Sequence, residues 1–443
     1  MITRLRLANF KSFDAGGHEI PLGSLALMVG TNASGKSNHR DALRFLHGVG
    51  RGYTLPEILG AKYGEGGERL WAGIRGGARE LVHGAKGGKV SVECDVRWST
   101  TTMAISRKRP VRRVRAWVLR YKLELLISGK LKRKVASVAN ESLHSSSTPI
   151  FSTFPDVLKA TQPGDGKQLL VRIKKPGGKK YIGPTMKLRN DQPLLSQLAS
   201  HPEATATTQT ACRALISALS SMRFLDLEPQ ALRRPSLPGQ DVLGDKGENL
   251  SSVLQELCKN ELRKESLIEW TRELTPLDVE DIEFKSVSLD GKIQLALKEA
   301  GGRLITAESA SDGTLRFLAF AAALLGTKPA GTYVFEEIEN GIHPNRVHLL
   351  LELLQQATGE GKTQVIATTH SPALLNFLRG RSLESALLVT RSGDSSRVRQ
   401  LKDLPIADGD LSMAGDLLES GWFENVTEYL NAADDEIGGE GRA

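Results

Sequence analysis

The chain has 443 residues, 40% of them hydrophobic and 25% charged, with a net charge of +8, which is typical of a water-soluble globular protein with more than one domain. Its apolar runs are shorter than the roughly 18 residues that a membrane span needs, so we expect no membrane partner and a cytoplasmic location. The three cysteines, Cys94, Cys212 and Cys258, lie far apart without CxxC spacing, which gives no indication of a zinc site or a disulfide framework.

The first fifty residues predict a strand, a second strand, a glycine-rich loop and a helix. Residues 2–13 alternate as in a half-buried strand, and the apolar run 24–30 leads into GTNASGKS at 30–37. Helical spacing follows from Lys36, and Gly48 is placed to end the helix.

GTNASGKS fits the phosphate-loop pattern, in which backbone N–H groups and a helix N-terminus surround phosphate oxygens. In this pattern Lys36 neutralises the phosphates and Ser37 ligates Mg²⁺, so we expect ATP and Mg²⁺ as cofactors. The nucleotide-binding residues predicted in this segment are Gly30, Asn32, Ser34, Gly35, Lys36, Ser37 and Asn38.

The stretch that begins at Arg107 and ends at Lys134 holds twelve basic residues and one acid. Clustered cations gain affinity by releasing counterions from phosphates, which predicts DNA binding without sequence preference. A solvated hairpin face explains the stretch equally well, because runs of charged residues usually lie on the surface. A second basic run lies at 167–189.

Short strand patterns run from about residue 88 to 185, and the polar segment 140–149 is expected to be a mobile linker. Helical patterns follow at 207–222 and 249–273, without a heptad repeat that would predict a long coiled coil. After residue 280, strand and helix patterns alternate, which argues for a largely parallel sheet covered by helices.

The apolar strand at 333–335 ends in two carboxylates. Glu336 falls where a carboxylate would bind Mg²⁺ through water, and Glu337 falls where a base would polarise the attacking water. The following Glu339 and Asn340 fit the polar start of an ordinary helix.

Two further segments offer groups to an anion. Ser311 and Gly313 stand at the start of an apolar helix, although Asp312 as the helix cap explains this segment equally well. A later apolar strand delivers His370 to its carboxyl end, where open α/β sheets bind ligands.

In four motifs the chain resembles the head domain of ABC-type ATPases of the SMC/RecF/OLD group, and most closely the compact AAA members found in bacterial phage-defence operons. These motifs are, in chain order, GKSN at 35–38, SDGT at 311–314, FEEIENGIHP at 335–344 and ATTHSP at 367–372. The resemblance also includes NFKSF at 9–13, and it covers the region from about 50 to 205 poorly.

This resemblance implies a head-to-head dimer, or a higher homo-oligomer, bridged by ATP. Ser311 and Gly313 would contact the γ-phosphate that the other subunit binds, His370 would be the switch histidine, and Lys11 and Ser12 would lie near the nucleotide. The catalytic residues would be Lys36, Glu337 and His370, with Ser37 and Glu336 on the metal.

The sequence departs from the family's pattern in two places. Glu336 stands where most ABC proteins have aspartate, so hydrolysis could be slow. A Q-loop glutamine is not identified, since the first glutamine of the chain is Gln162.

By this resemblance the fold class is α/β, an ABC-ATPase head with a mixed or parallel sheet core and an inserted β-rich and helical lobe. We expect four parts: 1–50 with the phosphate loop, 51–205 as a β-rich basic lobe, 206–280 as a helical lobe, and 281–443 with the signature, the acidic strand end, the switch histidine and a C-terminal tail.

The implied function is that of an ATP-hydrolysing sensor or regulatory subunit acting with DNA and a separately encoded nuclease or effector, in anti-phage defence. A RecF-like repair ATPase stays open, and so does an OLD-like ATPase with its own nuclease, for which Asp408 and Asp410 are the candidate acids. A transporter cassette is disfavoured because SDGT replaces LSGGQ, and a structural scaffold because the phosphate-handling positions are all kept.

Overall fold

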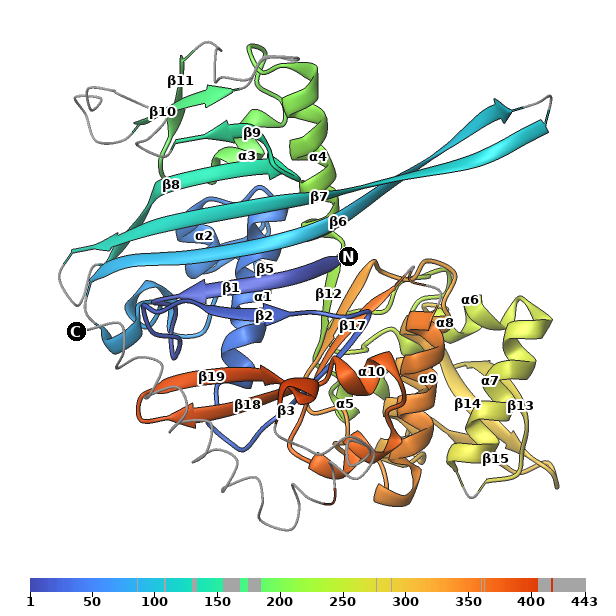
Figure 1. Ribbon diagram of the computed structural model, residues 1–443. Helices are drawn as coiled ribbons and strands as arrows, with labels where there is room; N and C mark the ends of the chain where they lie inside the picture. The colour runs from blue at the N-terminus through green and yellow to red at the C-terminus, as the bar shows by residue number, and fades with distance from the viewer. Residues whose placement is uncertain are drawn as a thin grey trace. The chain divides into compact units, whose positions relative to one another are not determined.

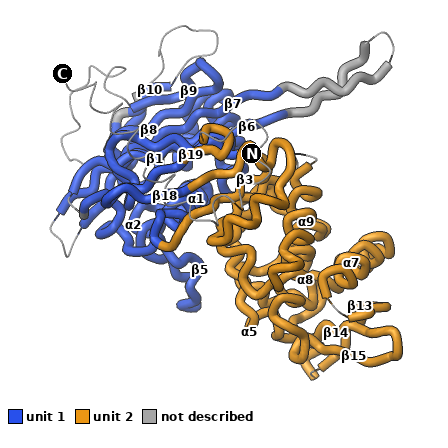
Figure 2. Tube along the Cα trace, turned by 60° about the horizontal axis from the view of Figure 1, so that its bottom comes forward, with its two compact units in different colours: residues 1–22, 33–221, 389–398 blue, residues 23–32, 222–388, 399–443 orange. Residues whose placement is uncertain are grey.

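The computed structural model describes residues 1–85, 87–106, 109–129, 134–153, 168–173, 185–275, 277–287, 289–359, 361, 363–404 and 416. The chain forms two compact units that exchange segments (Figure 2). The first comprises 1–22, 33–221 and 389–398, and the second comprises 23–32, 222–388 and the stretch from Arg399. Parts of both basic runs, and the predicted acids Asp408 and Asp410, lie outside the described residues.

An eight-stranded antiparallel sheet in the order β11-β10-β9-β8-β7-β6-β1-β2 forms the base of the first unit (Figure 1). Alternate residues of β7 are buried, as expected for a sheet with one covered face: Leu119, Tyr121, Leu123, Leu125 and Ile127. The strands are β1 Ile2–Ala8, β2 His18–Pro21, β6 Gly88–Ser106, β7 Arg109–Ser128, β8 Val135–Ser145, β9 Thr148–Ser152, β10 Gln168–Ile173 and β11 Thr185–Arg189.

The hairpin of β6 and β7 extends beyond the other strands of this sheet (Figure 1). β6 pairs with β1 up to Val96 and β7 pairs with β8 from Leu119, whereas the β6–β7 ladder continues to its far end. Trp98 and Trp117 face each other across this ladder with ring centroids 5.2 Å apart. We call residues 97–106 and 109–118 the hairpin arm.

The predicted helix after the phosphate loop is α1, Lys36–Gly50, and it runs past Gly48. A Cβ at Gly48 would lie 2.9 Å from Ile58 Cγ1 of α2, so glycine is needed for helix packing and does not end the helix. The prediction of a helix end at this residue is therefore wrong. The other short elements of the unit are α2 Leu55–Leu59, β4 Lys62–Tyr63, β5 Arg69–Trp71, η1 Gly77–Arg79, η2 His83–Ala85, α3 Leu194–Leu198 and α4 Ala206–Ser220.

The segment 140–149, expected to be a mobile linker, instead contributes to β8 and β9. Its Glu141 is fully buried and accepts hydrogen bonds from the backbone N–H groups of Leu194 and Leu195, at 2.6 and 2.8 Å, and from the Tyr121 hydroxyl at 2.9 Å. Burial raises the pKa of Glu141 to about 7, although the three hydrogen bonds favour the carboxylate and by themselves would lower the pKa. The prediction is wrong because partners distant in sequence hold this polar segment.

The second unit contains a parallel sheet in the order β12-β16-β17-β3-β18. Its strands are β3 Leu25–Val29, β12 Met222–Leu225, β16 Thr332–Phe335, β17 Gln364–Thr369 and the start of β18 Leu387–Ser392. The rest of β18 and most of β19 Ser395–Gln400 belong to the first unit. The helices are α5 Pro229–Leu232, α6 Leu250–Cys258, α7 Glu261–Leu274, α8 Asp312–Leu325, η4 Pro344–Arg346, α9 Val347–Gly359, η5 Pro372–Phe377, α10 Arg381–Glu384 and η6 Leu401–Asp403.

A separate antiparallel sheet in this unit consists of β13 Val279–Ser286, β14 Ile293–Glu299 and β15 Leu304–Thr306. The sequence pattern predicted a parallel arrangement from residue 280 onward, and this is wrong for β14. It is correct for β16 and β17, which pair in parallel.

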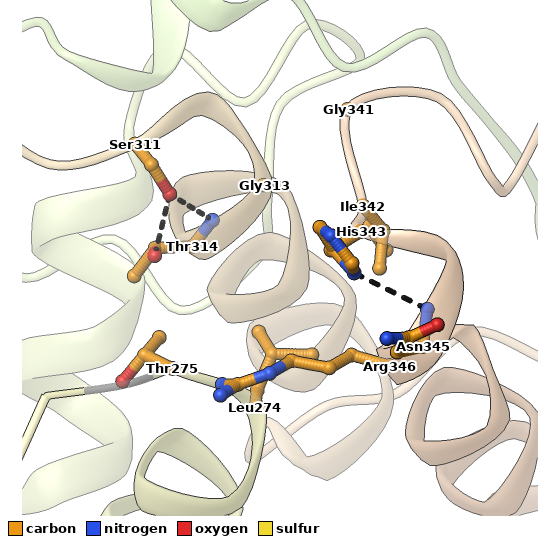
Figure 3. Close-up of a pocket in the computed structure, with 10 residues that line it drawn as sticks. All are labelled: Leu274, Thr275, Ser311, Gly313, Thr314, Gly341, Ile342, His343, Asn345 and Arg346. Atoms are coloured by element: carbon orange, nitrogen blue, oxygen red, sulfur yellow. Dashed lines mark hydrogen bonds between the residues drawn. The ribbon is translucent and has the colours of Figure 1, made fainter.

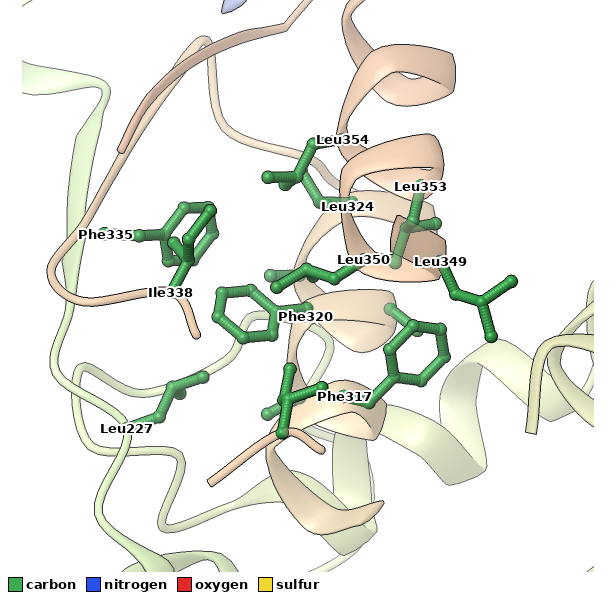
Figure 4. Packing of buried hydrophobic residues seen from close by; sticks show 14 of the residues in the cluster. Leu227, Phe317, Phe320, Leu324, Phe335, Ile338, Leu349, Leu350, Leu353 and Leu354 are labelled. Carbon is green, nitrogen blue, oxygen red and sulfur yellow. The ribbon is translucent and has the colours of Figure 1, made fainter. Parts of the chain in front are cut away.

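Aromatic and aliphatic side chains from α8, α9 and β16 pack together beneath the end of β16 (Figure 4). Phe320 of α8 meets Phe335 of β16 edge to face, with ring centroids 4.8 Å apart. Ile338, just beyond the strand, is also buried in this cluster. The chain is thus anchored on both sides of Glu336 and Glu337.

The α/β fold class is confirmed. The longest helices in the described part of the chain, α1 and α4, have 15 residues, so this part has no long coiled coil. None of its helices combines the length and apolarity needed to cross a bilayer. Cys94 and Cys212 are buried thiols. The four-part division of the sequence stays a prediction.

Candidate nucleotide site

The phosphate-loop segment joins β3 to α1, as its pattern predicts. Gly30 to Asn32 belong to the second unit, and the loop continues in the first unit from Ala33. Ala33 and Gly35 have positive φ values of 60° and 113°, and Gly35 precedes α1 without a side-chain cap. The first turn of α1 carries no acid, so its backbone N–H groups and Lys36 suit an anion such as a nucleotide phosphate.

Gly35 is constrained by a residue far away in the sequence. A Cβ at this position would lie 2.1 Å from Ser396 Oγ, and the φ of 113° also disfavours any side chain. Glycine is therefore required here by backbone conformation and by packing.

Ser396 is fully buried in β19 and supports the loop through a chain of hydrogen bonds. Its Oγ lies 2.6 Å from the carbonyl oxygen of Ser34 and 2.6 Å from Ser12 Oγ. Since the carbonyl can only accept, Ser396 donates its single hydroxyl proton to Ser34, and Ser12 donates to Ser396. Asn38 Nδ2 in turn donates to Ser12 Oγ at 2.7 Å. This chain links three predicted nucleotide-binding residues to Ser396, which the sequence did not indicate.

Lys11 forms an ion pair with a carboxylate of α1. Its Nζ lies 2.6 Å from Asp41 Oδ2, and Arg75 Nη2 lies 3.0 Å from the same oxygen. Both the Lys11 and the Asp41 side chains are buried. Two cations thus neutralise Asp41, and a direct contact of Lys11 with nucleotide stays a prediction.

Three predicted site segments leave the parallel sheet of the second unit at the same edge. Val29 of β3 is opposite Thr369 of β17, and Phe335 of β16 is opposite Ala367. The residues that follow these strands are Gly30, His370 and Glu336. Carboxyl ends of adjacent parallel strands are where such sheets bind ligands.

Glu337 has a fixed carboxylate and an unusual backbone. Its φ of 48° is uncommon for a residue with a side chain and costs roughly 1–3 kcal/mol. The backbone N–H donates to Thr368 Oγ1 at 3.1 Å. One carboxylate oxygen lies 3.1 Å from His370 Nε2, and the other accepts from Asn340 Nδ2. The predicted pair Glu337 and His370 is therefore brought together.

Glu339 and Asn340 were expected to be the polar turn into the next helix, and they do lie in a turn before η4, but both also contact predicted site residues. Asn340 binds the Glu337 carboxylate, and Glu339 Oε1 accepts from the backbone N–H of His370 at 2.7 Å. The short helix η4 begins later, and its N-cap is His343. The spacing of three residues from Glu337 to Asn340 is the signal that could have identified the contact.

Ser311 is the N-cap of α8, and its Oγ accepts from the backbone N–H of Thr314 at 3.1 Å. The alternative that Asp312 caps this helix is therefore wrong. Asp312 instead pairs with Arg233, at 2.7 Å from Nη2 to Oδ1. A cap at Ser311 leaves its hydroxyl at the helix N-terminus, where anions are favoured.

Gly313 lies directly against the loop that follows Glu337. A Cβ at Gly313 would be 2.2 Å from the carbonyl oxygen of Gly341. Arg316 of the same helix donates to the carbonyl of Asn340 at 2.7 Å. We call residues 336–343 the acidic loop. It contains Glu337 near its beginning, and its Gly341 packs against the start of α8.

The predicted magnesium ligands Ser37 and Glu336 stand at the start of α1 and just after β16, respectively. A hydroxyl and a carboxylate are oxygen donors of the kind that Mg²⁺ binds together with nucleotide phosphates. Within the described ranges, no group of three or more His, Cys, Asp or Glu side chains could hold a metal ion.

A family model described as "AAA domain, putative AbiEii toxin, Type IV TA system" matches residues 126–376. Similar solved structures include an SMC head bound to the C-winged helix domain of ScpA, with 16% identity, coverage of 90% of this chain and 97% of that chain, and a TM-score of 0.46. The SMC head domain from Thermotoga maritima has 16% identity, coverage of 90% and 98%, and a TM-score of 0.40. An Smc head domain with a coiled coil and joint from Pyrococcus yayanosii has 13% identity, coverage of 95% and 99%, and a TM-score of 0.42. No curated protein matches the chain.

Proposed function

The chain belongs to this AAA-domain family, and from that premise we propose that it binds and hydrolyses ATP and that ATP joins two copies head-to-head. The observation that carries the proposal is the Glu337 carboxylate, held at the end of β16 by His370 and Asn340. A carboxylate fixed in this way can orient a water molecule and accept its proton.

ATP with Mg²⁺ supplies the phosphoanhydride bond that is broken and the cation that offsets the charge of the phosphates. Lys36 and the backbone of the phosphate loop would hold these phosphates, while Ser37 and Glu336 would hold the metal. Glu337 takes the proton of the attacking water, and His370 keeps the carboxylate in place through its Nε2. Because Glu336 is one methylene longer than aspartate, we expect slow turnover.

The proposed dimer is supported by the place of Ser311 and Gly313 at the start of α8, where helix backbone N–H groups favour an anion. In the proposed dimer these residues contact the γ-phosphate held by the other copy. The acidic loop connects this contact to Glu337, since Gly341 packs on Gly313 and Asn340 binds Glu337. Binding of ATP would then favour the closed dimer, and hydrolysis would release it.

We further propose that the chain is a cytoplasmic sensor or regulatory subunit in anti-phage defence, acting with a separately encoded nuclease or effector. The toxin in the family's description supports defence over RecF-like repair. The hairpin arm supports DNA binding, because its strand β7 carries Arg109, Arg112, Arg113 and Arg115. An OLD-like nuclease of its own is the alternative.

The ATPase proposal is tested by measuring phosphate release from ATP by the purified chain. Glu337→Gln should lower kcat by about 10²–10³ while ATP still binds, because only the general base is removed. Lys36→Ala should abolish ATP binding. Glu384→Gln, in the short helix α10, is a matched control and should be unaffected. Unchanged turnover in Glu337→Gln would rule out the assigned role.

DNA binding is tested separately with a duplex of random sequence at several salt concentrations. Replacing Arg112, Arg113 and Arg115 with alanine should weaken binding and reduce its salt dependence by about 2–3 in slope. If the affinity and its salt dependence stay as in the wild type, the hairpin arm does not bind DNA.

A further inference from the structure

A pocket of about 500 Å³ in the second unit is shared by the start of α8, the acidic loop and η4 (Figure 3). This size is in the range of small-molecule sites. No acidic residue is among those that line it: Leu274, Thr275, Ser311, Gly313, Thr314, Gly341, Ile342, His343, Asn345 and Arg346. The pocket therefore combines hydrogen-bond donors with one permanent positive charge, and this suits an anion.

In this pocket, the guanidinium group of Arg346 has a nitrogen that lacks a hydrogen-bond partner among the described residues. This nitrogen, Nη1, is buried. A buried polar atom without a partner costs roughly 1–3 kcal/mol, and more when the group is charged. A phosphate oxygen would satisfy it, since guanidinium groups bind phosphates with strong, charge-assisted hydrogen bonds.

Two further donors are oriented by local hydrogen bonds. The backbone N–H of Asn345 donates to His343 Nδ1 at 3.3 Å, so the proton of the neutral imidazole is on Nε2. Ser311 Oγ accepts from the backbone N–H of Thr314 and lies 2.8 Å from Thr314 Oγ1, and when the Thr314 hydroxyl donates in that second contact the Ser311 hydroxyl proton is left to donate to a ligand. The pocket thus offers the Nε2–H of His343, the hydroxyl of Ser311 and the guanidinium of Arg346.

We propose that this pocket receives the terminal phosphates of the ATP bound by a second copy of the chain, and that Arg346 supplies the positive charge there. The inference rests on the proposed function, in which Ser311 and Gly313 contact that phosphate. Those two residues offer only neutral donors, and so they cannot by themselves offset phosphate charge. Arg346 thereby becomes a nucleotide-contacting residue that acts on the other copy's ATP.

The experiment mixes two variants that are defective for different reasons. Lys36→Ala cannot hold ATP but retains Arg346, and Arg346→Ala holds ATP but lacks the charge. Each alone should hydrolyse ATP at least about tenfold more slowly than the wild type. Mixed in equal amounts before ATP is added, they should recover a rate several-fold above that of either variant alone, because ATP on the Arg346→Ala copy can pair with Arg346 of the Lys36→Ala copy and each such mixed dimer contains one complete site.

The controls separate this inference from the proposed function. Arg381→Ala, in α10, should keep full activity alone. Arg346→Gln preserves more of the packing than Arg346→Ala. If both variants lose the same fraction of ATP turnover, the defect comes from the missing charge and not from misfolding. No recovery on mixing, or full activity of Arg346→Ala alone, would overturn the inference. In either case, ATP turnover by the wild-type chain would leave the proposed function intact. Binding of inorganic phosphate that depends on Arg346 without any effect on ATP turnover would also overturn it.

Discussion

Replacing Ser396 with alanine tests whether a residue 362 positions away from Ser34 holds the phosphate loop in place. The substitution removes a hydroxyl with two contacts of 2.6 Å, to Ser34 and Ser12. The Ser34 carbonyl then lacks its buried donor, at roughly 1–3 kcal/mol for such a group. We expect the free energy of unfolding to fall by that amount, and the ATP dissociation constant to rise about five- to tenfold, or about 1–1.4 kcal/mol.

The assay combines urea unfolding with calorimetric titration of ATP and Mg²⁺ into the folded variant. Ser395→Ala is the matched control, since this neighbour bonds to Asp394 and His83 and not to the loop. Ser396 does not hold the loop in place if Ser396→Ala binds ATP as tightly as the wild type, or if both alanine variants weaken binding equally.

Two further predictions concern Gly313 and Glu141. Gly313→Ala places a Cβ 2.2 Å from the Gly341 carbonyl oxygen, so it should displace the acidic loop and lower ATP turnover at least about tenfold. Gly301→Ala is the control and should leave turnover unchanged, because its Cβ would lie in open space. Equal turnover rates in the two variants would contradict the prediction. Glu141→Ala removes the acceptor of three buried hydrogen bonds and should lower the free energy of unfolding by roughly 3 kcal/mol, whereas exposed Glu203→Ala should change it little. Because burial raises the folded-state pKa of Glu141 from 4.5 to about 7, the folded state binds this proton more tightly, and stability should decrease as pH rises between these values. Glu141→Gln should flatten that decrease, and an unchanged pH dependence in urea unfolding would show that another group causes it.

The phosphate loop, the acidic strand end and the strand that carries His370 could be predicted because each is a local pattern. A short apolar strand followed by glycines and Gly-Lys-Ser needs no tertiary information to be recognised. The positions of Glu336 and Glu337 follow in the same way from the end of β16.

The supporting residues could not be predicted because their partners are far away in the sequence. Ser396 resembles any serine of a hairpin until the fold places it beneath Gly35. Glu141 lies in a polar segment that resembles a linker, yet its carboxylate caps residues more than fifty positions later. Asn340 could not be predicted for a different reason, since an asparagine before a glycine fits a turn whether or not it contacts the Glu337 carboxylate.

In the proposed function, ATP bridges two copies of the chain and Glu337 ends this state by hydrolysis. The most direct test is the mass of the Glu337→Gln variant in solution with saturating ATP and Mg²⁺, measured by light scattering after size-exclusion chromatography. If ATP bridges two copies, the mass should be twice the 48.1 kDa of a single chain and should return to 48.1 kDa when Lys36→Ala is added to the same variant. A mass of 48.1 kDa for Glu337→Gln with ATP bound would contradict it.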